Sequence, residues 1–126
     1  MNKIYIKNKI ISENSKPFVV AEMSGNHNQS LEMALRIVKA AHKAGADAIK
    51  LQSYSAENMT LNISKPDFVI RDKNSPWHGM KLYDLYKKAA TPKNWFEKIY
   101  KYAQKIGIIC FSSVFDVETV KFLEKI

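Results

Sequence analysis

Apolar and polar residues alternate along this chain with two periods, one typical of strands and one typical of helices. In residues 3–11 apolar and polar side chains alternate as in two short strands, KIYI and KII, with Lys7 and Asn8 at the turn between them. Pro17 precedes FVVAEM (residues 18–23), an apolar run with β-branched residues that is typical of a buried strand. We therefore expect a hairpin at the edge of the domain and then the first strand of its core.

The clearest predicted helix covers residues 30–44, where apolar side chains recur at helical spacing and charged ones fall on the opposite face. Asn28 or Ser30 is placed to cap its start, and Gly45 suits the left-handed position after its end. The segment DAIKLQSY (residues 47–54) follows and predicts a second strand.

A third unit repeats this order after a long loop and a short helix. Thr91 predicts an N-cap with Pro92 at the first helical position, and Gly107 ends that helix. The apolar run IICFSS then predicts a third strand. Asp116 is placed to cap a last helix over 117–126 that is still running where the sequence stops.

Strands that alternate with crossover helices must be parallel, with right-handed connections. Two architectures satisfy this order: an open doubly wound sheet, or the beginning of a (β/α)8 barrel. A full barrel takes about 250 residues, so the 126 residues here make about half of one. We expect an α/β fold, the N-terminal portion of a (β/α)8 TIM barrel, with a hairpin domain (1–16) before the truncated barrel (17–126).

Composition narrows the class of protein. The 46% hydrophobic content excludes disorder, and no apolar run approaches the ~18 residues of a membrane span. The single cysteine, Cys110, excludes a disulfide framework and fits a cytoplasmic protein. The net charge of +8 comes almost entirely from scattered Lys, with only Arg36 and Arg71 as arginines, so we expect no nucleic-acid partner.

Chemistry-bearing residues gather at the predicted strand ends, where both architectures place their sites. Glu22 ends the first core strand, and a charged group there needs a partner, a metal or a ligand. Asn26 follows in a turn before a helix N-terminus, which suits an anion. The alternative is a capped turn in which His27 is a surface histidine.

The second strand places Lys50 and Gln52 on one face, opposite to Ile49 and Leu51. In a barrel that face is the interior, where a lysine needs a carboxylate or an anionic substrate. Glu22 on the neighbouring strand is the expected partner. A purely structural salt bridge is the alternative.

Ser112 and Ser113 end the third strand just before a capped helix. Two hydroxyls beside backbone N–H donors predict a phosphate cradle, although ordinary capping explains them as well. Cys110 precedes them and is expected in the core. The long irregular stretch 53–79 is expected to cover a site and offers Trp77 as an aromatic face, unless that ring only packs the loop down.

Three segments, in order and at these separations, resemble the sialic acid synthase family, most closely its pseudaminic acid synthase branch. They are AE-x-x-x-NHN (21–28), DAIKLQ-x-Y (47–54) and FSS-x-FD (111–116), with LYDLYKKAATP between the last two. The resemblance begins near residue 17 and covers only the first half of the family's barrel.

The resemblance implies a (β/α)8 barrel that condenses phosphoenolpyruvate with an amino-sugar aldehyde, giving a nine-carbon acid and phosphate. It implies a homodimer, and a manganese or magnesium ion held by two histidines from later strands. No metal ligand is therefore expected among the residues of this chain, neither His27 nor His78, and the chain alone is expected to be inactive.

The resemblance also implies individual roles. Glu22 matches the glutamate beside the reacting carbons of phosphoenolpyruvate, and Lys50 matches the lysine that holds its anionic groups. Ser113, with Ser112 beside it, matches a hydroxyl near the carboxylate or phosphate, while Val114 departs from the proline of many relatives.

On the sugar side, the resemblance implies substrate contacts for Gln52 and Tyr54, and we add Asn26 and Trp77 to the substrate-binding set. The sugar implied by the branch is 2,4-diacetamido-2,4,6-trideoxy-L-altrose. Three alternatives stay open: an N-acetylneuraminate synthase, another phosphate-handling barrel such as a phospho-sugar aldolase, and a non-catalytic basic binding module.

Overall fold

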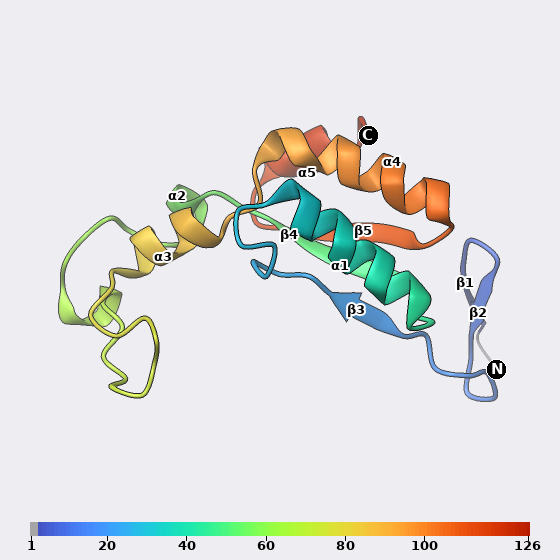
Figure 1. Ribbon diagram of the computed structural model, residues 1–126, viewed down its shortest axis with the longest axis horizontal. Coiled ribbons are helices and arrows are strands. Elements are labelled where there is room, and N and C mark those ends of the chain that lie inside the picture. The colour runs from blue at the N-terminus through green and yellow to red at the C-terminus, as the bar shows by residue number, and fades with distance from the viewer. Residues whose placement is uncertain (1–2) are drawn as a thin grey trace.

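A computed structural model gives the structure of the chain and describes residues 3–126. Its elements lie in the order expected of repeated βα units (Figure 1). They are β1 (Ile4–Ile6), β2 (Lys9–Ile11), β3 (Val20–Glu22), α1 (Leu31–Lys43), β4 (Ala48–Ser53), α2 (Ala56–Met59), η1 (Pro66–Phe68), α3 (Leu82–Ala89), η2 (Lys93–Trp95), α4 (Phe96–Ile106), β5 (Ile109–Val114) and α5 (Val117–Leu123).

The predicted hairpin is confirmed: β1 and β2 pair antiparallel, and Lys7 in the turn has a left-handed φ of 53°. Residues 1 and 2 of the predicted hairpin domain lie outside the described residues. Figure 1 shows the hairpin at the end of the molecule that lies away from α3. Lys9 Nζ lies 2.8 Å from Asp47 Oδ1, so an ion pair joins the hairpin to the start of β4.

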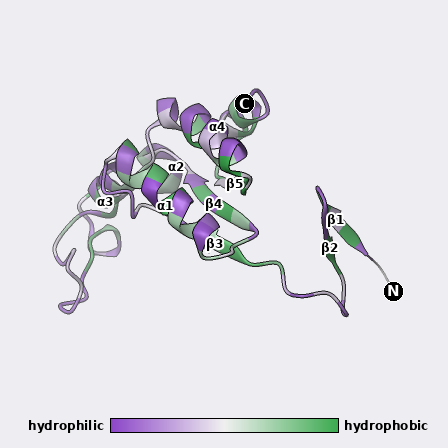
Figure 2. Cartoon of the chain, turned by 45° about the vertical axis from the view of Figure 1, so that its right-hand side comes forward, coloured by the Kyte–Doolittle hydropathy of each residue, from purple (hydrophilic) through white to green (hydrophobic). Residues whose placement is uncertain are grey.

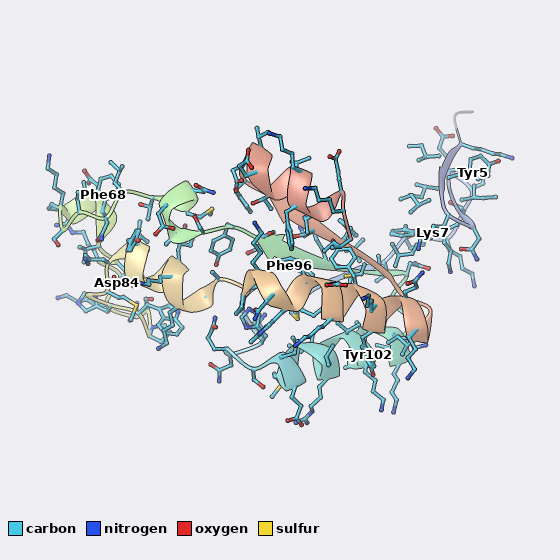
Figure 3. The ribbon with its side chains drawn as sticks, turned by 90° about the horizontal axis from the view of Figure 1, so that it is seen from above. Tyr5, Lys7, Phe68, Asp84, Phe96 and Tyr102 are labelled. Atoms are coloured by element: carbon cyan, nitrogen blue, oxygen red, sulfur yellow. The ribbon has the colours of Figure 1, made fainter. Side chains whose placement is uncertain are left out.

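The predicted parallel sheet is also confirmed, with strand order β3-β4-β5. In register, Glu22 lies beside Lys50, and Gln52 lies beside Ser113. Helices α1, α4 and α5 form one layer on a single face of this sheet (Figures 1 and 3). All three strands point the same way, so their carboxyl ends meet at one edge.

Local capping explains where α1 and α4 begin and end. The Ser30 side chain accepts a hydrogen bond from the Met33 N–H at the start of α1, and Gly45 follows its end with a φ of 85°. Gly107 ends α4 with a φ of 84°. Glycine carries no Cβ, so it takes up this left-handed conformation without strain.

The core lies between the sheet and its helices, where apolar side chains from β4 meet those from α1 and α4. Its members have almost no exposed surface; they include Met23, Ala34, Val38, Ile49, Leu51, Phe96, Ile99 and Ala103. Figure 2 shows the corresponding pattern, with helices that alternate between hydrophilic and hydrophobic positions. Burying a Val, Leu, Ile, Phe or Met side chain contributes roughly 1.5–3 kcal/mol, and burying an alanine contributes less.

The opposite face of the sheet is not covered by any helix of the described residues. Val20 and Phe111 are 41% and 39% exposed on it, and Ile6 and Phe18 join them around a cavity of about 270 Å³. The prediction that FVVAEM is a buried strand is therefore wrong in part. Met23 is buried against the helices, whereas Val20 faces the open side because strand residues alternate.

Residues 54–90 form a lobe that extends away from the sheet, as Figure 1 shows at the left. The lobe contains α2, η1 and α3, and a bridge between Val69 and Lys81 closes its outer loop. The predicted short helix is therefore confirmed as α3. The prediction that residues 53–79 are irregular is wrong in part, because Ser53 ends β4 and both α2 and η1 lie within that stretch.

Two predicted helix boundaries are wrong. A 3-10 turn, η2, begins after Pro92, so Thr91 does not cap a helix that starts at once. The last helix ends at Leu123 and does not run on to residue 126, although Asp116 caps its start by accepting from the Thr119 N–H.

Among residues 3–126, no helix is long and apolar enough to cross a membrane.

Candidate active site

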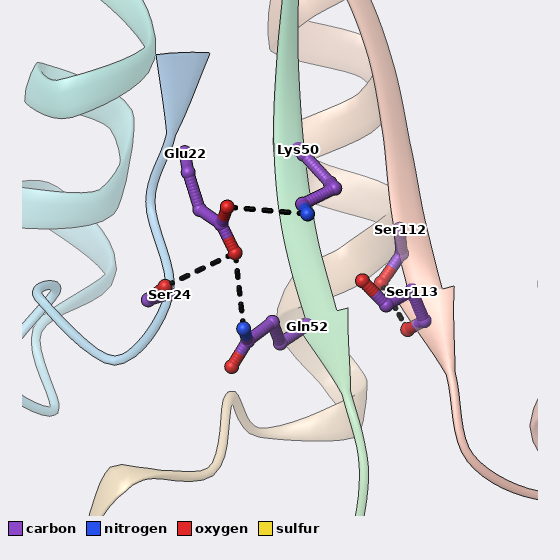
Figure 4. Close-up of polar contacts among 6 residues, drawn as sticks. All are labelled: Glu22, Ser24, Lys50, Gln52, Ser112 and Ser113. Carbon is purple, nitrogen blue, oxygen red and sulfur yellow. Dashed lines mark hydrogen bonds and ion pairs between the residues drawn. The ribbon is translucent and has the colours of Figure 1, made fainter. Parts of the chain in front are cut away.

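Glu22, Lys50 and Gln52 meet at the carboxyl edge of the sheet (Figure 4). Lys50 Nζ lies 3.1 Å from Glu22 Oε2, which confirms the expected partnership. Gln52 Nε2 donates to Glu22 Oε1 at 3.0 Å, and Ser24 Oγ donates to the same oxygen at 3.3 Å. One carboxylate thus accepts hydrogen bonds from three side chains on neighbouring strand ends.

The sheet register explains why these groups meet. Ile49 and Leu51 pack against the helices, so the alternating residues Lys50 and Gln52 face the open side. Glu22 stands in register with Lys50 and faces the same way. We call Glu22, Ser24, Lys50 and Gln52 the strand-end cluster.

The charges in the strand-end cluster favour an ionised carboxylate. The hydrogen bond and the attraction from Lys50 hold the pKa of Glu22 below its ordinary value, and the bonds from Gln52 and Ser24 act in the same direction. The side chains of Glu22 and Lys50 are partly exposed, so solvent and a ligand both reach them. The cluster can therefore present an ammonium group to an anion beside a fixed negative charge.

Of the two predicted serines, only Ser113 shares a face with the strand-end cluster, because it stands in register with Gln52. Ser112 stands in register with Leu51 and faces the helices, and its hydroxyl donates to the Ser113 carbonyl at 2.9 Å. The expectation of two hydroxyls in one cradle is therefore wrong, since consecutive strand residues point to opposite faces.

Asn26 and Trp77 lie in a second place, where they line one cavity of about 510 Å³ with residues of α3. Trp77 is 40% exposed, and Lys88 Nζ lies 5.3 Å from the centroid of its ring. The lobe therefore covers the loop between β3 and α1, and the structure brings together two residues that are far apart in sequence.

Tyr54 lies in a third place and lines a cavity of about 470 Å³ with Asp116 and residues at the start of α4 and α5. Its ring meets those of Tyr86 and Phe115 edge-on, with centroids 5.8 and 5.9 Å away. Burial raises the pKa of the Tyr54 hydroxyl. The predicted substrate-binding residues are thus spread over several places on the carboxyl side of the sheet.

Two residues near the site were missed or misjudged from the sequence. Ser24 lies in the turn after β3, two positions after Glu22, and its hydroxyl donates to the Glu22 carboxylate. The alternative that His27 is a surface histidine is wrong: its side chain is completely buried, with Nε2 3.0 Å from Thr91 Oγ1. No local signal reveals this contact, because Thr91 lies 64 residues further along the chain.

Cys110 is half-buried, and burial raises the pKa of its thiol to about 12. A thiol that stays protonated at neutral pH is a packing residue and not a nucleophile. Within the part of the chain that the structure describes, no three His, Cys, Asp or Glu side chains gather as metal ligands would.

The sequence of the chain is similar to those of known proteins. The chain is 53% identical over 110 residues to a pseudaminic acid synthase of Campylobacter jejuni and 39% identical to one of Helicobacter pylori. Each alignment covers 87% of this chain but only 32% of the relative, so the chain spans about a third of these proteins.

Solved structures give the same result. A sialic acid synthetase of Leptospira borgpetersenii, solved in complex with citrate, superposes with a TM-score of 0.76 at 29% identity, covering 98% of this chain and 38% of that one. A spore coat polysaccharide biosynthesis protein of Bacillus subtilis superposes with a TM-score of 0.69 over the same share of this chain and 31% of its own. The sheet and helices seen here are therefore an N-terminal portion of such a barrel. Residues 37–126 match the model of the NeuB family, and the chain belongs to that family.

Proposed function

We propose that this chain forms the phosphoenolpyruvate-binding part of a nonulosonic acid synthase of the pseudaminic acid branch. The reaction joins C3 of phosphoenolpyruvate to the aldehyde carbon of 2,4-diacetamido-2,4,6-trideoxy-L-altrose, and water then adds at C2 and phosphate leaves. The product is a nine-carbon acid. The observation that carries this proposal is the Lys50–Glu22 pair, with its 3.1 Å contact, at the carboxyl edge of the sheet.

Each half of the pair has a task in this reaction. The Lys50 ammonium binds the carboxylate or phosphate of phosphoenolpyruvate through a charge-assisted hydrogen bond. The Glu22 carboxylate, kept ionised by its neighbours, stabilises positive charge at C2 or orients the attacking water. Ser113, on the same face, donates its hydroxyl to the anion.

The choice of sugar is supported by two observations. The relatives with 53% and 39% identity are both pseudaminic acid synthases. The cavity between Asn26 and Trp77 offers an amide beside an aromatic face, which can pack on a sugar ring or its 6-methyl group. Gln52 and Tyr54 complete the proposed sugar side.

The family implies a manganese or magnesium ion. Residues 3–126 gather no set of three His, Cys, Asp or Glu side chains, so they do not fit such an ion by themselves. A cytoplasmic location and a homodimer belong to this proposal as well.

The test uses the longest form of the protein that contains this sequence, supplied with divalent metal, phosphoenolpyruvate and sugar. We expect phosphate release that requires the sugar, and a higher efficiency with the diacetamido sugar than with N-acetylmannosamine. Lys50→Ala should raise the KM for phosphoenolpyruvate by about tenfold to a hundredfold and affect the sugar KM less. Lys39→Ala, which removes an exposed lysine of α1, is the matched control.

Two results would contradict the proposal. An unchanged KM for phosphoenolpyruvate in Lys50→Ala removes the role given to that ammonium group. Covalent trapping of pyruvate on Lys50 by borohydride would instead indicate an imine-forming aldolase, in which the lysine attacks a carbonyl carbon.

A further inference from the structure

The loop between β3 and α1 is fastened to the chain between α3 and α4 at three points. Gly25, His27 and Gln29 supply the contacts on one side, and residues 88–91 supply them on the other. We call these contacts the loop clamp. The loop clamp links the segment that follows Glu22 to the lobe that carries Trp77.

His27 is the buried centre of the loop clamp. Its Nδ1 accepts a hydrogen bond from the Gln29 backbone N–H at 3.1 Å, and its Nε2 lies 3.0 Å from Thr91 Oγ1. A backbone N–H only donates, so Nδ1 carries no proton. The proton of the neutral ring therefore sits on Nε2, which donates to the Thr91 hydroxyl.

The surroundings of the imidazole favour its neutral form. The imidazole contacts the Thr91 hydroxyl, the Gln29 backbone amide and the edge-on ring of Trp95, whose centroid lies 5.4 Å from its own. None of these three groups carries a charge. Burial alone lowers the pKa of His27. Protonation at Nδ1 would also abolish the bond from Gln29.

The other two contacts hold the same segments together. Gln29 Nε2 donates to the carbonyls of Lys88 and Ala90, 2.8 Å each, at the end of α3. Gly25 lies so close to Ala89 that an added Cβ would stand 3.0 Å from the Ala89 carbonyl oxygen. The loop therefore fits against this turn with no room for a larger residue.

We propose that His27 is a positioning residue, which as the neutral Nε2–H tautomer holds the β3–α1 loop on the α3–α4 turn and so sets the distance between Asn26 and Trp77. For its effect on sugar binding, this inference rests on the proposed function. It assigns His27 no contact with substrate. It predicts that loss of the clamp acts on the sugar before it acts on phosphoenolpyruvate.

The first experiment observes the ring directly, by NMR of the full chain labelled with ¹⁵N-histidine. We expect the ¹⁵N shifts of the Nε2–H tautomer and a His27 pKa below the ordinary value for histidine. We also expect the Gln29 amide to be protected from hydrogen exchange. An Nδ1–H tautomer, or a His27 pKa at or above the ordinary value for histidine, would overturn the proposal.

The second experiment separates positioning from folding by kinetics. His27→Gln and Thr91→Val should each raise the sugar KM by about tenfold and the phosphoenolpyruvate KM by less than about twofold. Thr91→Ser, which keeps the hydroxyl, should restore the sugar KM, and His42→Gln should change nothing. In the parent protein the sugar KM should rise as pH falls through the His27 pKa, and His27→Gln should lose this dependence.

The outcomes stay distinct even where a variant fails. If His27→Gln does not fold, Thr91→Val with the Thr91→Ser rescue decides the question. Equal rises in both KM values would overturn the positioning role. If no condensation occurs at all, the proposed function and the sugar effect fall together, while the tautomer and the Gln29 protection still decide whether the loop clamp exists.

Discussion

At the scale of single residues, the strand-end cluster shows how neighbouring charges set a protonation state. Glu22 is partly exposed, yet Lys50, Gln52 and Ser24 all donate toward its carboxylate. Its ionised form is therefore favoured at pH values where an isolated glutamate would begin to protonate.

The pKa of Glu22 should lie below its ordinary value of 4.5 in an NMR titration of the carboxyl carbon. The folded pKa is lower than the unfolded one, so the pair contributes stability above about pH 4.5 and loses it as pH falls through the lowered value. Lys50→Met should shift the Glu22 pKa upward. Lys39→Met should leave it unchanged, and equal titrations in both variants would refute the ion pair.

How far these contacts follow from the sequence depends on how local they are. The Glu22–Lys50 pair follows from strand alternation and from the adjacency of consecutive parallel strands. The same alternation separates Ser112 from Ser113, which is a register effect that the motif alone hides. The contact of His27 with Thr91 joins residues on distant turns, and no spacing rule predicts it.

At the scale of elements, helix ends were predictable where their determinants are local. Ser30 and Gly107 act as the sequence indicates, because a cap uses groups within one turn. Thr91 does not, because its hydroxyl meets His27 and a 3-10 turn comes before α4. The ends of strands are harder to predict from the sequence than the ends of helices, because the neighbouring strands with which they pair decide them.

Gly25 allows the close packing of the β3–α1 loop on α3, and its replacement tests this packing. Gly25→Ala should lower the free energy of unfolding by about 1–3 kcal/mol, because the new Cβ meets the backbone of Ala89. It should also shift the NMR signals of residues 88–91.

Gly45→Ala is the control for a loss of glycine without a clash. Its φ is +85° and an added Cβ meets nothing within 4 Å, so only backbone strain of about 1–2 kcal/mol remains. The signals of residues 88–91 should not move. If Gly25→Ala also leaves them in place, the loop does not fit against α3 as tightly as described.

At the scale of the whole molecule, the helices cover one face of the sheet, and the other face carries both the strand-end cluster and apolar side chains. Alternation along the strands predicted the two faces, and the order of elements predicted the parallel sheet. The exposure of Val20 was not predicted, because an apolar run alone does not tell which side is covered.

The open apolar face should bind a hydrophobic dye. Val20 and Phe111 border a cavity of about 270 Å³ lined only by apolar residues. We expect 8-anilinonaphthalene-1-sulfonate fluorescence with the folded chain, and Phe111→Lys should weaken it several-fold without changing the far-UV circular dichroism. Val117→Lys, on the exposed side of α5, is the control. Fluorescence that survives Phe111→Lys would place the dye elsewhere.

The backbone of the β3–α1 loop also has a consequence for the order of folding. Ser24, Asn28 and Gln29 have φ values of 48°, 49° and 54°, a left-handed conformation that costs roughly 1–2 kcal/mol for a residue with a Cβ. The bonds that offset this strain span 59 to 64 residues, so they form only after the chain between them has been ordered. The loop should therefore reach its native form after the folding transition state. Thr91→Val should speed unfolding in stopped-flow experiments and leave the folding rate nearly unchanged.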